Sequence, residues 1–370
     1  MRLPWPALLA LFTCAFIAVM TELLPAGLLP EMASGLGVAQ SRVGFLVTAY
    51  AVASFAAAIP VTALVRHLPR RPLLMTLLAG FALVNLVTAA SSSYALTFAA
   101  RGLAGVVGGT MWAMLVGYAA RLVPAGRSGR AIAIVSAGIT VALCFGIPAG
   151  AALAGVTGWR TAFATLSAVA LGLAVLLRWA VPDLPGERGG GRRVTVPPGV
   201  WPLLATTGLL LVGHQSMYTY LAPFAGSATP VLLLVFGLAT VGGVVVTAVL
   251  VDRWLRVLAV AALAMVAVSL AALGLGFLPA VAVWGLAFGG APTLLQAWLV
   301  RNAGPDNADM AVSMQTTVYN AGIAAGSLAG GLVLDGMGAP ALPWVAAPLV
   351  LAALLLLMTT RMFMNDRSVV

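Results

Sequence analysis

The chain has 370 residues, of which 62% are hydrophobic and only 8% are charged, and its mean hydropathy is +1.08. A soluble domain needs a charged surface, so this composition excludes one and predicts an all-α polytopic membrane protein. The net charge of +10 comes from 19 basic residues, all arginine, which form no basic stripe of the kind that binds nucleic acid.

Twelve apolar segments follow one another, each close to the roughly 20 residues that a transmembrane helix needs. The first resembles a signal peptide at its start, but it continues through Glu22 to Leu29 without a convincing small-residue cleavage site. We therefore expect twelve transmembrane helices, at residues 7–29, 43–65, 73–90, 95–120, 131–156, 162–179, 200–224, 231–251, 257–273, 277–300, 310–334 and 344–362.

The arginines divide unevenly between the two sets of alternating connections. Arg42 and Arg160 lie in one set and Arg101 lies inside a segment, whereas the other 16 lie at the termini or in the opposite set. Because positive residues are enriched on the cytoplasmic side, we expect both termini in the cytoplasm and the protein in a bacterial inner membrane. The 16 arginines are Arg2, Arg66, Arg70, Arg71, Arg121, Arg127, Arg130, Arg178, Arg188, Arg192, Arg193, Arg253, Arg256, Arg301, Arg361 and Arg367.

The longest break in hydrophobicity covers residues 182–198, which are rich in glycine, proline and arginine and are typical of a flexible linker. It separates a predicted six-helix bundle at 1–181 from a second at 199–370. The two halves resemble each other, since the connection at 121–126 (RLVPAG) has a counterpart at 301–306 (RNAGPD). This repeat predicts two pseudo-symmetric, parallel six-helix bundles related by an axis normal to the membrane.

Arg101 places a permanent positive charge inside the segment 95–120. An arginine in hydrocarbon needs an anion, a group of carbonyls or a water-filled cavity, and Glu22 is the one acid well inside a segment of the first half. We expect both to face one polar cavity, where burial favours a neutral Glu22 and Arg101 favours its carboxylate. A permanently ionised pair that only fixes helix packing is the alternative. The other acids are expected in solvent: Glu31, Asp183, Glu187, Asp306, Asp309, Asp335 and Asp366.

Small residues recur at every fourth position of the fifth segment, which aligns them on one helix face where a neighbour can approach closely. Pro148 lies in this stripe and predicts a bend. The eleventh segment repeats the pattern, and Gly105 and Gly109 give the fourth a similar face. We interpret these helices as a seam between rocking halves, and tight packing in a static bundle is the alternative. The two stripes are Gly138, Ala142, Gly146, Gly150 and Ala154, and Gly322, Gly326 and Gly330.

Three stretches carry a family resemblance. They are residues 21–30 (TELLPAGLLP), residues 101–105 (RGLAG), and residues 146–150 (GIPAG) followed by GWR at 158–160. Together they resemble the major facilitator superfamily, specifically its twelve-span drug:proton antiporter branch, which includes sugar and arabinose efflux permeases. The resemblance implies the major facilitator fold over essentially the whole chain, proton coupling at the arginine motif and an exporter signature in the fifth segment.

One connection departs from that family pattern. The family usually carries an aspartate ahead of the basic cluster between the second and third segments, but residues 62–74 have Arg66 at that place and Pro69 where glycine is usual. The second half keeps the acid as Asp252 beside Arg253. This departure puts in doubt a charge-relay latch formed by Arg66, Arg70 and Arg71.

Several polar or aromatic side chains inside segments are candidates to line a substrate path, although such groups also form bonds between helices. His214 is interpreted as a structural histidine, with a proton carrier as the alternative. Tyr218 and Tyr220 lie two apart, so we expect only one of them at the cavity. The substrate-path candidates are Tyr50, Asn85, Trp112, His214, Gln215, Tyr218, Gln296, Gln315 and Asn320.

Enzymatic functions find little support in the sequence. No glycine-rich phosphate loop is present, and the two histidines and two cysteines do not form a metal site. Cys14 and Cys144 lie in apolar segments, so we expect no disulfide. We expect a monomeric secondary transporter with no cofactor, driven by the proton gradient, that exports a drug-like compound or a sugar. A proton-coupled importer of the same fold and a non-transporting receptor or scaffold are the alternatives.

Overall fold

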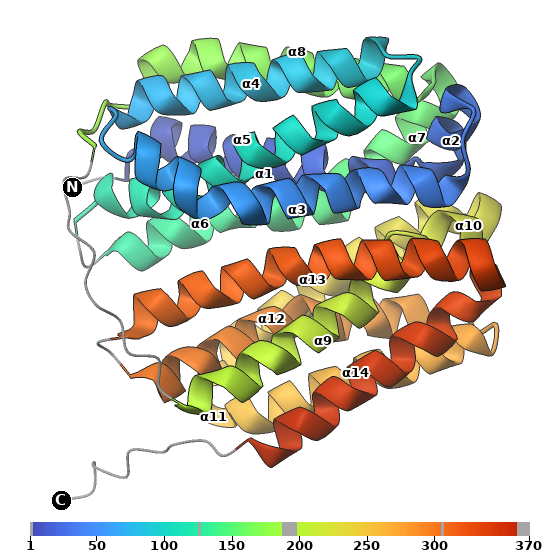
Figure 1. The fold of residues 1–370 in the computed structure, drawn as a ribbon. Coiled ribbons are helices and arrows are strands. Elements are labelled where there is room, and N and C mark those ends of the chain that lie inside the picture. Colours follow the sequence, from blue (N-terminus) through green and yellow to red (C-terminus); the bar gives the residue numbers. More distant parts are fainter. Residues whose placement is uncertain (1–2, 125–126, 187–197, 305–306, 361–370) are drawn as a thin grey trace, which may run out of the picture. The chain divides into compact units, whose positions relative to one another are not determined.

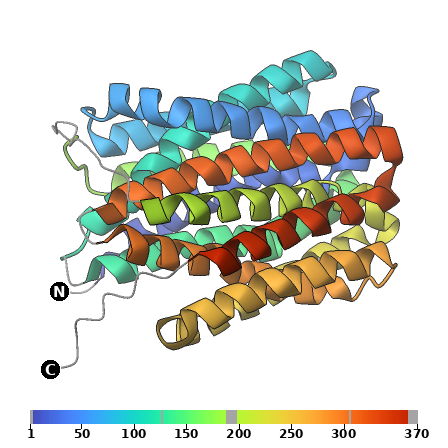
Figure 2. The ribbon, with the colours of Figure 1, turned by 60° about the horizontal axis from the view of Figure 1, so that its bottom comes forward.

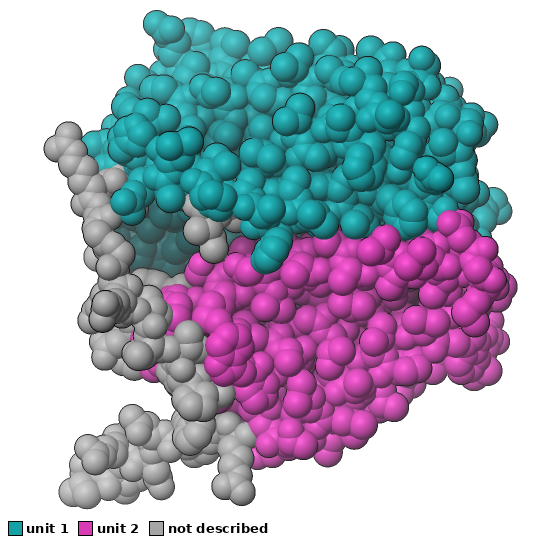
Figure 3. Space-filling model, in the orientation of Figure 1, with its two compact units in different colours: residues 1–190, 219–237 teal, residues 191–218, 238–370 magenta. Residues whose placement is uncertain are grey.

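The computed structural model describes residues 3–124, 127–186, 198–304 and 307–360, and within them it contains helices and no strands. Two compact units divide the chain, as coloured in Figure 3. Unit 1 consists of residues 1–190 and 219–237, and unit 2 of residues 191–218 and 238–370. The predicted halves differ from this grouping at 219–237, and most of the predicted linker, 187–197, lies outside the described residues.

Unit 1 contains the first part of the chain. Helices α3 and α5 lie side by side and run in the same direction, whereas α4 runs antiparallel to α8 (Figure 1). The helices are α1 (Trp5–Gly27), α2 (Leu29–Leu36), α3 (Gln40–Val65), α4 (Arg70–Ala90), α5 (Tyr94–Arg121), α6 (Ser128–Val141), α7 (Ile147–Thr157), α8 (Trp159–Ala180) and α10 (Leu221–Ala225). A π-helical turn, Ala142–Gly146, joins α6 to α7, and a 3₁₀ turn, Gly226–Ala228, follows α10.

Unit 2 is built around α9, with α13 and α14 packed along it, as Figures 1 and 2 both show. The helices are α9 (Trp201–Tyr218), α12 (Ala280–Ala303), α13 (Ala308–Met337) and α14 (Leu342–Thr359). Helix α11 (Thr229–Gly274) begins in unit 1 and continues in unit 2. Trp254 interrupts α11 with non-helical backbone angles, at the connection predicted between the eighth and ninth segments.

Helix ends follow local chemistry that the sequence makes visible. Ser93 begins α5, and its side chain accepts a hydrogen bond from the main-chain N–H of Leu96. Gly37 ends α2 with φ of 65°, and Gly158 separates α7 from α8 with φ of 87°; both values lie in the left-handed region that glycine adopts without strain. These sharp ends let successive helices reverse direction over a few residues.

Nine helices of the described part are long and apolar enough to cross a membrane, or ten if the bent pair Leu29–Leu36 and Gln40–Ala57 forms one span. Helix α9 is not among them, because its second half carries His214, Gln215 and Ser216. Helix α11, joined with α10, counts once although it covers two predicted segments. Twelve transmembrane helices therefore remain a prediction, which requires that α9 and each of the two parts of α11 cross the membrane.

Candidate functional site

The side chain of Arg101 lies in the interior of unit 1, where it is 1% exposed. Helix α5 carries it, and its Nη2 donates a hydrogen bond to the main-chain carbonyl oxygen of Glu22 in α1, at 3.0 Å. Its guanidinium carbon lies 5.1 Å from the ring centroid of Tyr50 in α3. A carbonyl and an aromatic face thus hold a charge that would otherwise be costly to bury.

Glu22 lies beside this arginine but bonds it only through the main chain. Its side chain is 7% exposed, and Oε1 has no hydrogen-bond partner among the described residues. Two further donors of Arg101, Nε and Nη1, likewise make no hydrogen bond within the described chain. The arrangement therefore leaves a buried acid next to unused donors, instead of the closed ion pair that is the structural alternative.

The neighbouring polar groups come from α1, α3 and α4. Asn85 is fully buried in α4, and its Nδ2 donates to Oγ1 of Thr21 at 3.0 Å. The Asn85 Oδ1 and the Tyr50 hydroxyl are buried without a hydrogen-bond partner in the part of the chain that the structure describes. We call Thr21, Glu22, Tyr50, Asn85 and Arg101 the polar cluster.

Glycines on α5 bring α3 close enough to place Tyr50 over Arg101. A Cβ added to Gly105 would collide with the main-chain oxygen of Tyr50, and one on Gly109 would lie 2.6 Å from the main-chain oxygen of Ser54. A Cβ on Gly108 would collide with the Tyr50 hydroxyl. Sequence reasoning singled out Gly105 and Gly109 but missed Gly108, which clears space for the tyrosine.

The small-residue stripe of the fifth predicted segment packs on α1. A Cβ on Gly138 would collide with the main-chain oxygen of Phe12, one on Gly146 with the Met20 sulfur, and one on Gly150 would lie 2.6 Å from Leu24 Cδ1. Pro148 is the second residue after the π-helical turn Ala142–Gly146. The wider turn occurs where proline removes a hydrogen bond from the helix, and such turns are frequent at functional positions.

The corresponding glycines in unit 2 lie between α13 and α9. A Cβ on Gly322 would approach Leu211 Cβ to 2.7 Å, and one on Gly326 would approach the main-chain oxygen of Val212 to 2.7 Å and Gln215 Cβ to 2.8 Å. The same type of contact thus joins α1 to α6 and α7 in one unit and α9 to α13 in the other.

An aromatic cluster occupies the interior of unit 2. His214 in α9 stacks on Phe288 in α12, with ring centroids 3.4 Å apart and planes 7° from parallel. Tyr218 stacks on His214 with ring centroids 5.3 Å apart, and Trp284 meets His214 edge-on at 5.2 Å. We call these four residues the aromatic cluster. Sequence reasoning missed Trp284 and Phe288, although their spacing of four on one helix was a visible signal.

The other substrate-path candidates are scattered. Gln215 and Gln315 are each 3% exposed, and Gln315 Oε1 makes no hydrogen bond within the described residues. Asn320 bonds the Thr316 carbonyl of its own helix, Gln296 is partly exposed, and Trp112 packs against the hydrophobic core of unit 1. The Tyr220 hydroxyl in unit 1 donates to the Ser41 carbonyl at 3.5 Å.

The connections that we expect in the cytoplasm differ between the units in what their charged residues bind. Arg66 is exposed, whereas α4 begins against residues 182–186. There Arg70 N–H donates to the Leu184 carbonyl at 2.8 Å, and Arg71 N–H donates to Asp183 Oδ1 at 3.1 Å. In unit 2 an exposed ion pair joins Arg301 to Asp252 at 3.6 Å, and Arg253 lies 5.7 Å from the Trp254 ring.

The start of the predicted linker is therefore bonded to unit 1. Arg121 donates to the Pro185 carbonyl at 2.8 Å, and Tyr118 donates to the Pro182 carbonyl at 2.7 Å. Asp183 thus supplies an acid beside the basic cluster of a connection that has none of its own. The sequence placed Asp183 in solvent; its side chain is exposed but engaged.

Neither cysteine forms a disulfide, and Cys144 Sγ donates to the Gly237 carbonyl at 2.7 Å. Among the described residues, no three His, Cys, Asp or Glu side chains gather in a way that would hold a metal ion. The polar cluster can therefore exchange a proton or bind an anion, and the aromatic cluster can stack a planar group.

Comparisons with known proteins agree on one family. The sequence model of the Major Facilitator Superfamily matches residues 11–320. The chain is 32% identical to the "Transcription regulatory protein OpdE" of Pseudomonas aeruginosa, over 96% of this chain and 94% of that one. It is 30% identical to a chloramphenicol efflux pump of Mycobacterium tuberculosis, over 90% and 88% of the two chains. It is 27% identical to the purine ribonucleoside efflux pump NepI of Salmonella paratyphi C, over 96% and 92%.

A solved structure shares the fold. A bacterial homolog of the human lysosomal transporter Spinster, in an inward-facing and occupied conformation, aligns with a TM-score of 0.76 over 97% of both chains at 15% identity. At an identity this low, the similarity shows only that the two chains share a fold.

Proposed function

The chain belongs to the major facilitator superfamily, and from that premise we propose that it exports a small organic molecule in exchange for protons. Its relatives include efflux pumps, and its family consists of membrane transporters that bind small-molecule substrates and are not enzymes. We further propose a monomer in a bacterial inner membrane, with both termini in the cytoplasm and no cofactor. Alternating access, in which two halves rock about a central site, is the mechanism that such repeats favour.

The observation that carries the proposal is the buried, unpartnered oxygen of Glu22 next to Arg101. Burial favours the neutral acid, whereas the positive guanidinium favours the carboxylate, so a small change in their surroundings changes whether Glu22 holds a proton. Arg101 is fixed to the Glu22 main chain at 3.0 Å, which keeps the arginine close without neutralising the side chain. Glu22 would exchange the proton and Arg101 would tune its release.

The glycine contacts support the conformational change that alternating access requires. Helices α6 and α7 meet α1 through Gly138, Gly146 and Gly150, so a bend at the π-helical turn moves directly against the helix that carries Glu22. The stripe on α13 meets α9, the helix of His214 and Gln215, in the same manner. Each unit thus links one small-residue face to one set of polar or aromatic groups.

The substrate would be a drug-like compound or a sugar, and the aromatic cluster favours the former. Stacked faces of His214, Phe288 and Tyr218 suit a planar organic molecule. A sugar site usually requires more hydrogen-bonding groups around such a platform. The efflux pumps among the relatives, named for chloramphenicol and purine ribonucleosides, support a small organic molecule with a ring.

The test uses inside-out membrane vesicles with an imposed pH gradient, acidic inside. Antibiotics, dyes, nucleosides and sugars are screened for gradient-dependent uptake by the wild type, Glu22→Gln and Asp335→Asn, a control acid that is exposed at the end of α13. We expect uptake of one chemical class by the wild type and by Asp335→Asn, and its loss in folded Glu22→Gln. Uptake that persists in Glu22→Gln would place the coupling group elsewhere.

Two other functions make different predictions in the same vesicles. A proton-coupled importer would accumulate its substrate with the proton gradient, in right-side-out vesicles instead. A regulatory membrane protein that moves no solute is favoured by one observation, the similarity to a protein named as a transcription regulator. It would show no gradient-dependent flux of any compound in either orientation, and Glu22→Gln would leave this result unchanged.

A further inference from the structure

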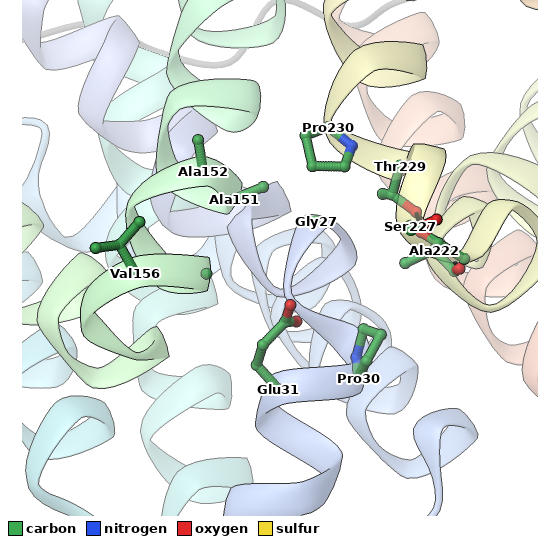
Figure 4. Close-up of a pocket in the computed structure, with 12 residues that line it drawn as sticks. Gly27, Pro30, Glu31, Ala151, Ala152, Val156, Ala222, Ser227, Thr229 and Pro230 are labelled. Carbon is green, nitrogen blue, oxygen red and sulfur yellow. Dashed lines mark hydrogen bonds between the residues drawn. The ribbon is translucent and has the colours of Figure 1, made fainter.

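A cavity lies in unit 1, and none of its lining residues belongs to the polar cluster. Its volume is about 340 Å³, which falls within the range of small-molecule sites. It lies where α1 gives way to α2, between the C-terminal end of α7 and the turn that joins α10 to α11 (Figure 4). By the orientation expected from the arginines, this is the side of the membrane away from the cytoplasm. Its lining residues include Gly27, Glu31, Ala151, Val156, Ser227 and Thr229.

The walls are mainly apolar and carry one ionisable group, Glu31. Figure 4 shows its carboxylate between Ala151 on one side and Ala222, Ser227 and Thr229 on the other, while the Val156 side chain points away from it. No arginine and no histidine is among the residues that line the cavity. The cavity therefore presents one negative charge within an apolar surface.

The carboxylate of Glu31 lacks a partner within the described chain. Its Oε2 is buried and makes no hydrogen bond there, and no ion pair joins Glu31 to any described arginine. The Glu31 side chain is partly exposed, so it meets solvent in part, as the sequence predicts, while Oε2 is enclosed. Its place in the first turn of α2 is electrostatically favourable for an acid. That position explains why an acid is tolerated here, but it leaves the buried oxygen unsatisfied.

From this geometry we propose that the cavity binds a small amphiphilic organic cation, whose ammonium or iminium group pairs with Glu31 while its ring packs on the apolar walls. An apolar cavity with one convergent charged group is the usual form of such a site. A cation would satisfy the buried oxygen, whereas an anion would be repelled and a neutral molecule would leave the charge unpaired. The site extends the proposed export function, because it would hold a cationic substrate outside the polar cluster.

The chain offers a way to block the cavity while keeping the charge. A Cβ added to Gly155, a lining residue on α7, would meet no atom within 4 Å. A larger side chain can therefore enter open space there without disturbing a neighbour, and Gly155→Leu also improves helix propensity. Gly172 on α8 has the same open surroundings away from the cavity, so Gly172→Leu is the matched control.

The experiment measures binding of ethidium, a planar organic cation, to the purified full-length protein in lipid nanodiscs with no gradient. We expect Glu31→Gln to weaken the dissociation constant roughly 10- to 100-fold, the scale of one charge-assisted contact, and Gly155→Leu to weaken it similarly. Asp335→Asn and Gly172→Leu should bind as the wild type does. Glu22→Gln should retain this binding, which separates the cavity from the polar cluster.

Three results would overturn the proposal. Ethidium affinity that is unchanged in both Glu31→Gln and Gly155→Leu would show that the cation binds elsewhere. Equal weakening of ethidium and of neutral chloramphenicol by Glu31→Gln would show that charge is not recognised. Loss of ethidium binding in Glu22→Gln alone would assign the cation to the polar cluster. Because no transport is measured, failure here leaves proton-driven export untouched, and failure of export in vesicles leaves this site standing.

Discussion

In both units glycines let neighbouring helices pack closely, but the interiors of the two units differ. In unit 1, glycines bring α5 against α3 and α7 against α1, and in unit 2 they bring α12 against α11 and α13 against α9. Yet the first interior holds Arg101 and Glu22, whereas the second holds stacked His214, Phe288 and Tyr218. A repeated scaffold has thus been kept while the groups that can do chemistry have diverged.

This difference suggests a division of labour. Among the residues whose burial the structure describes, Glu22 is the only buried acid, and it lies in unit 1. Proton exchange is therefore expected to belong to unit 1. The interior of unit 2 carries aromatic faces and two amides, Gln215 and Gln315, so it is expected to contribute mainly to ligand binding. Each prediction below would break or sharpen that assignment.

The largest effect is expected from Arg101→Gln. The change leaves the Glu22 carbonyl with a weaker donor and removes the charge that favours the Glu22 carboxylate, and loss of a buried charged partner typically costs about 3–5 kcal/mol. We expect the initial rate of gradient-driven uptake in inside-out vesicles to fall about 100-fold. Arg42→Gln, at an exposed arginine, is the control. A rate within about twofold of wild type would contradict a role for the polar cluster in coupling.

The next prediction tests whether the close glycine contacts contribute equally to the stability of both units. Gly105→Ala directs a methyl group at the Tyr50 carbonyl, and Gly289→Ala directs one at the Thr240 carbonyl, so each should lower the free energy of unfolding by about 1–3 kcal/mol. Gly102→Ala, which meets open space on the same helix as Gly105, should instead raise it by about 0.5–1 kcal/mol. Unfolding in mixed detergent micelles measures all three.

Opposite signs for Gly105→Ala and Gly102→Ala would show that close helix approach, not helix propensity, sets the result. If Gly289→Ala were harmless while Gly105→Ala was costly, the packing of the two units would differ in more than their interiors. Equal behaviour of all three variants would show that the close contacts at Gly105 and Gly289 do not limit substitution there.

Much of this organisation was visible in the sequence, because apolar length and charge placement are local properties. The runs around Arg101 and Glu22 predicted two buried charges in helices that now lie together. What the sequence could not supply is the register between helices: Arg101 bonds the carbonyl of Glu22 and not its carboxylate, and Phe288 stacks on His214 although the two are far apart in the chain. Likewise, nothing local to Asp183 indicates that it bonds the start of α4.

A smaller effect is expected from His214→Phe. Phenylalanine keeps the stack on Phe288 but removes the polar edge of the ring, so we expect the dissociation constant of the transported substrate to change by about 3- to 10-fold, the scale of one polar contact. The dependence of transport on the pH gradient should be preserved. Loss of gradient dependence with binding intact would make His214 a proton carrier and break the assignment of coupling to unit 1.

The smallest effects compare the two acids at the ends of the units that we expect to face the cytoplasm. Asp183 accepts the Arg71 N–H in the first turn of α4, a contact favoured by the helix dipole, so Asp183→Ala should destabilise the protein by about 1 kcal/mol. Asp252 and Arg301 are an exposed pair, so Asp252→Ala should cost between about 0 and 1 kcal/mol and less at high salt. Thermal unfolding at low and high salt checks both. If Asp252→Ala costs more stability than Asp183→Ala, then Asp252 stabilises its end of unit 2 more than Asp183 stabilises the corresponding end of unit 1.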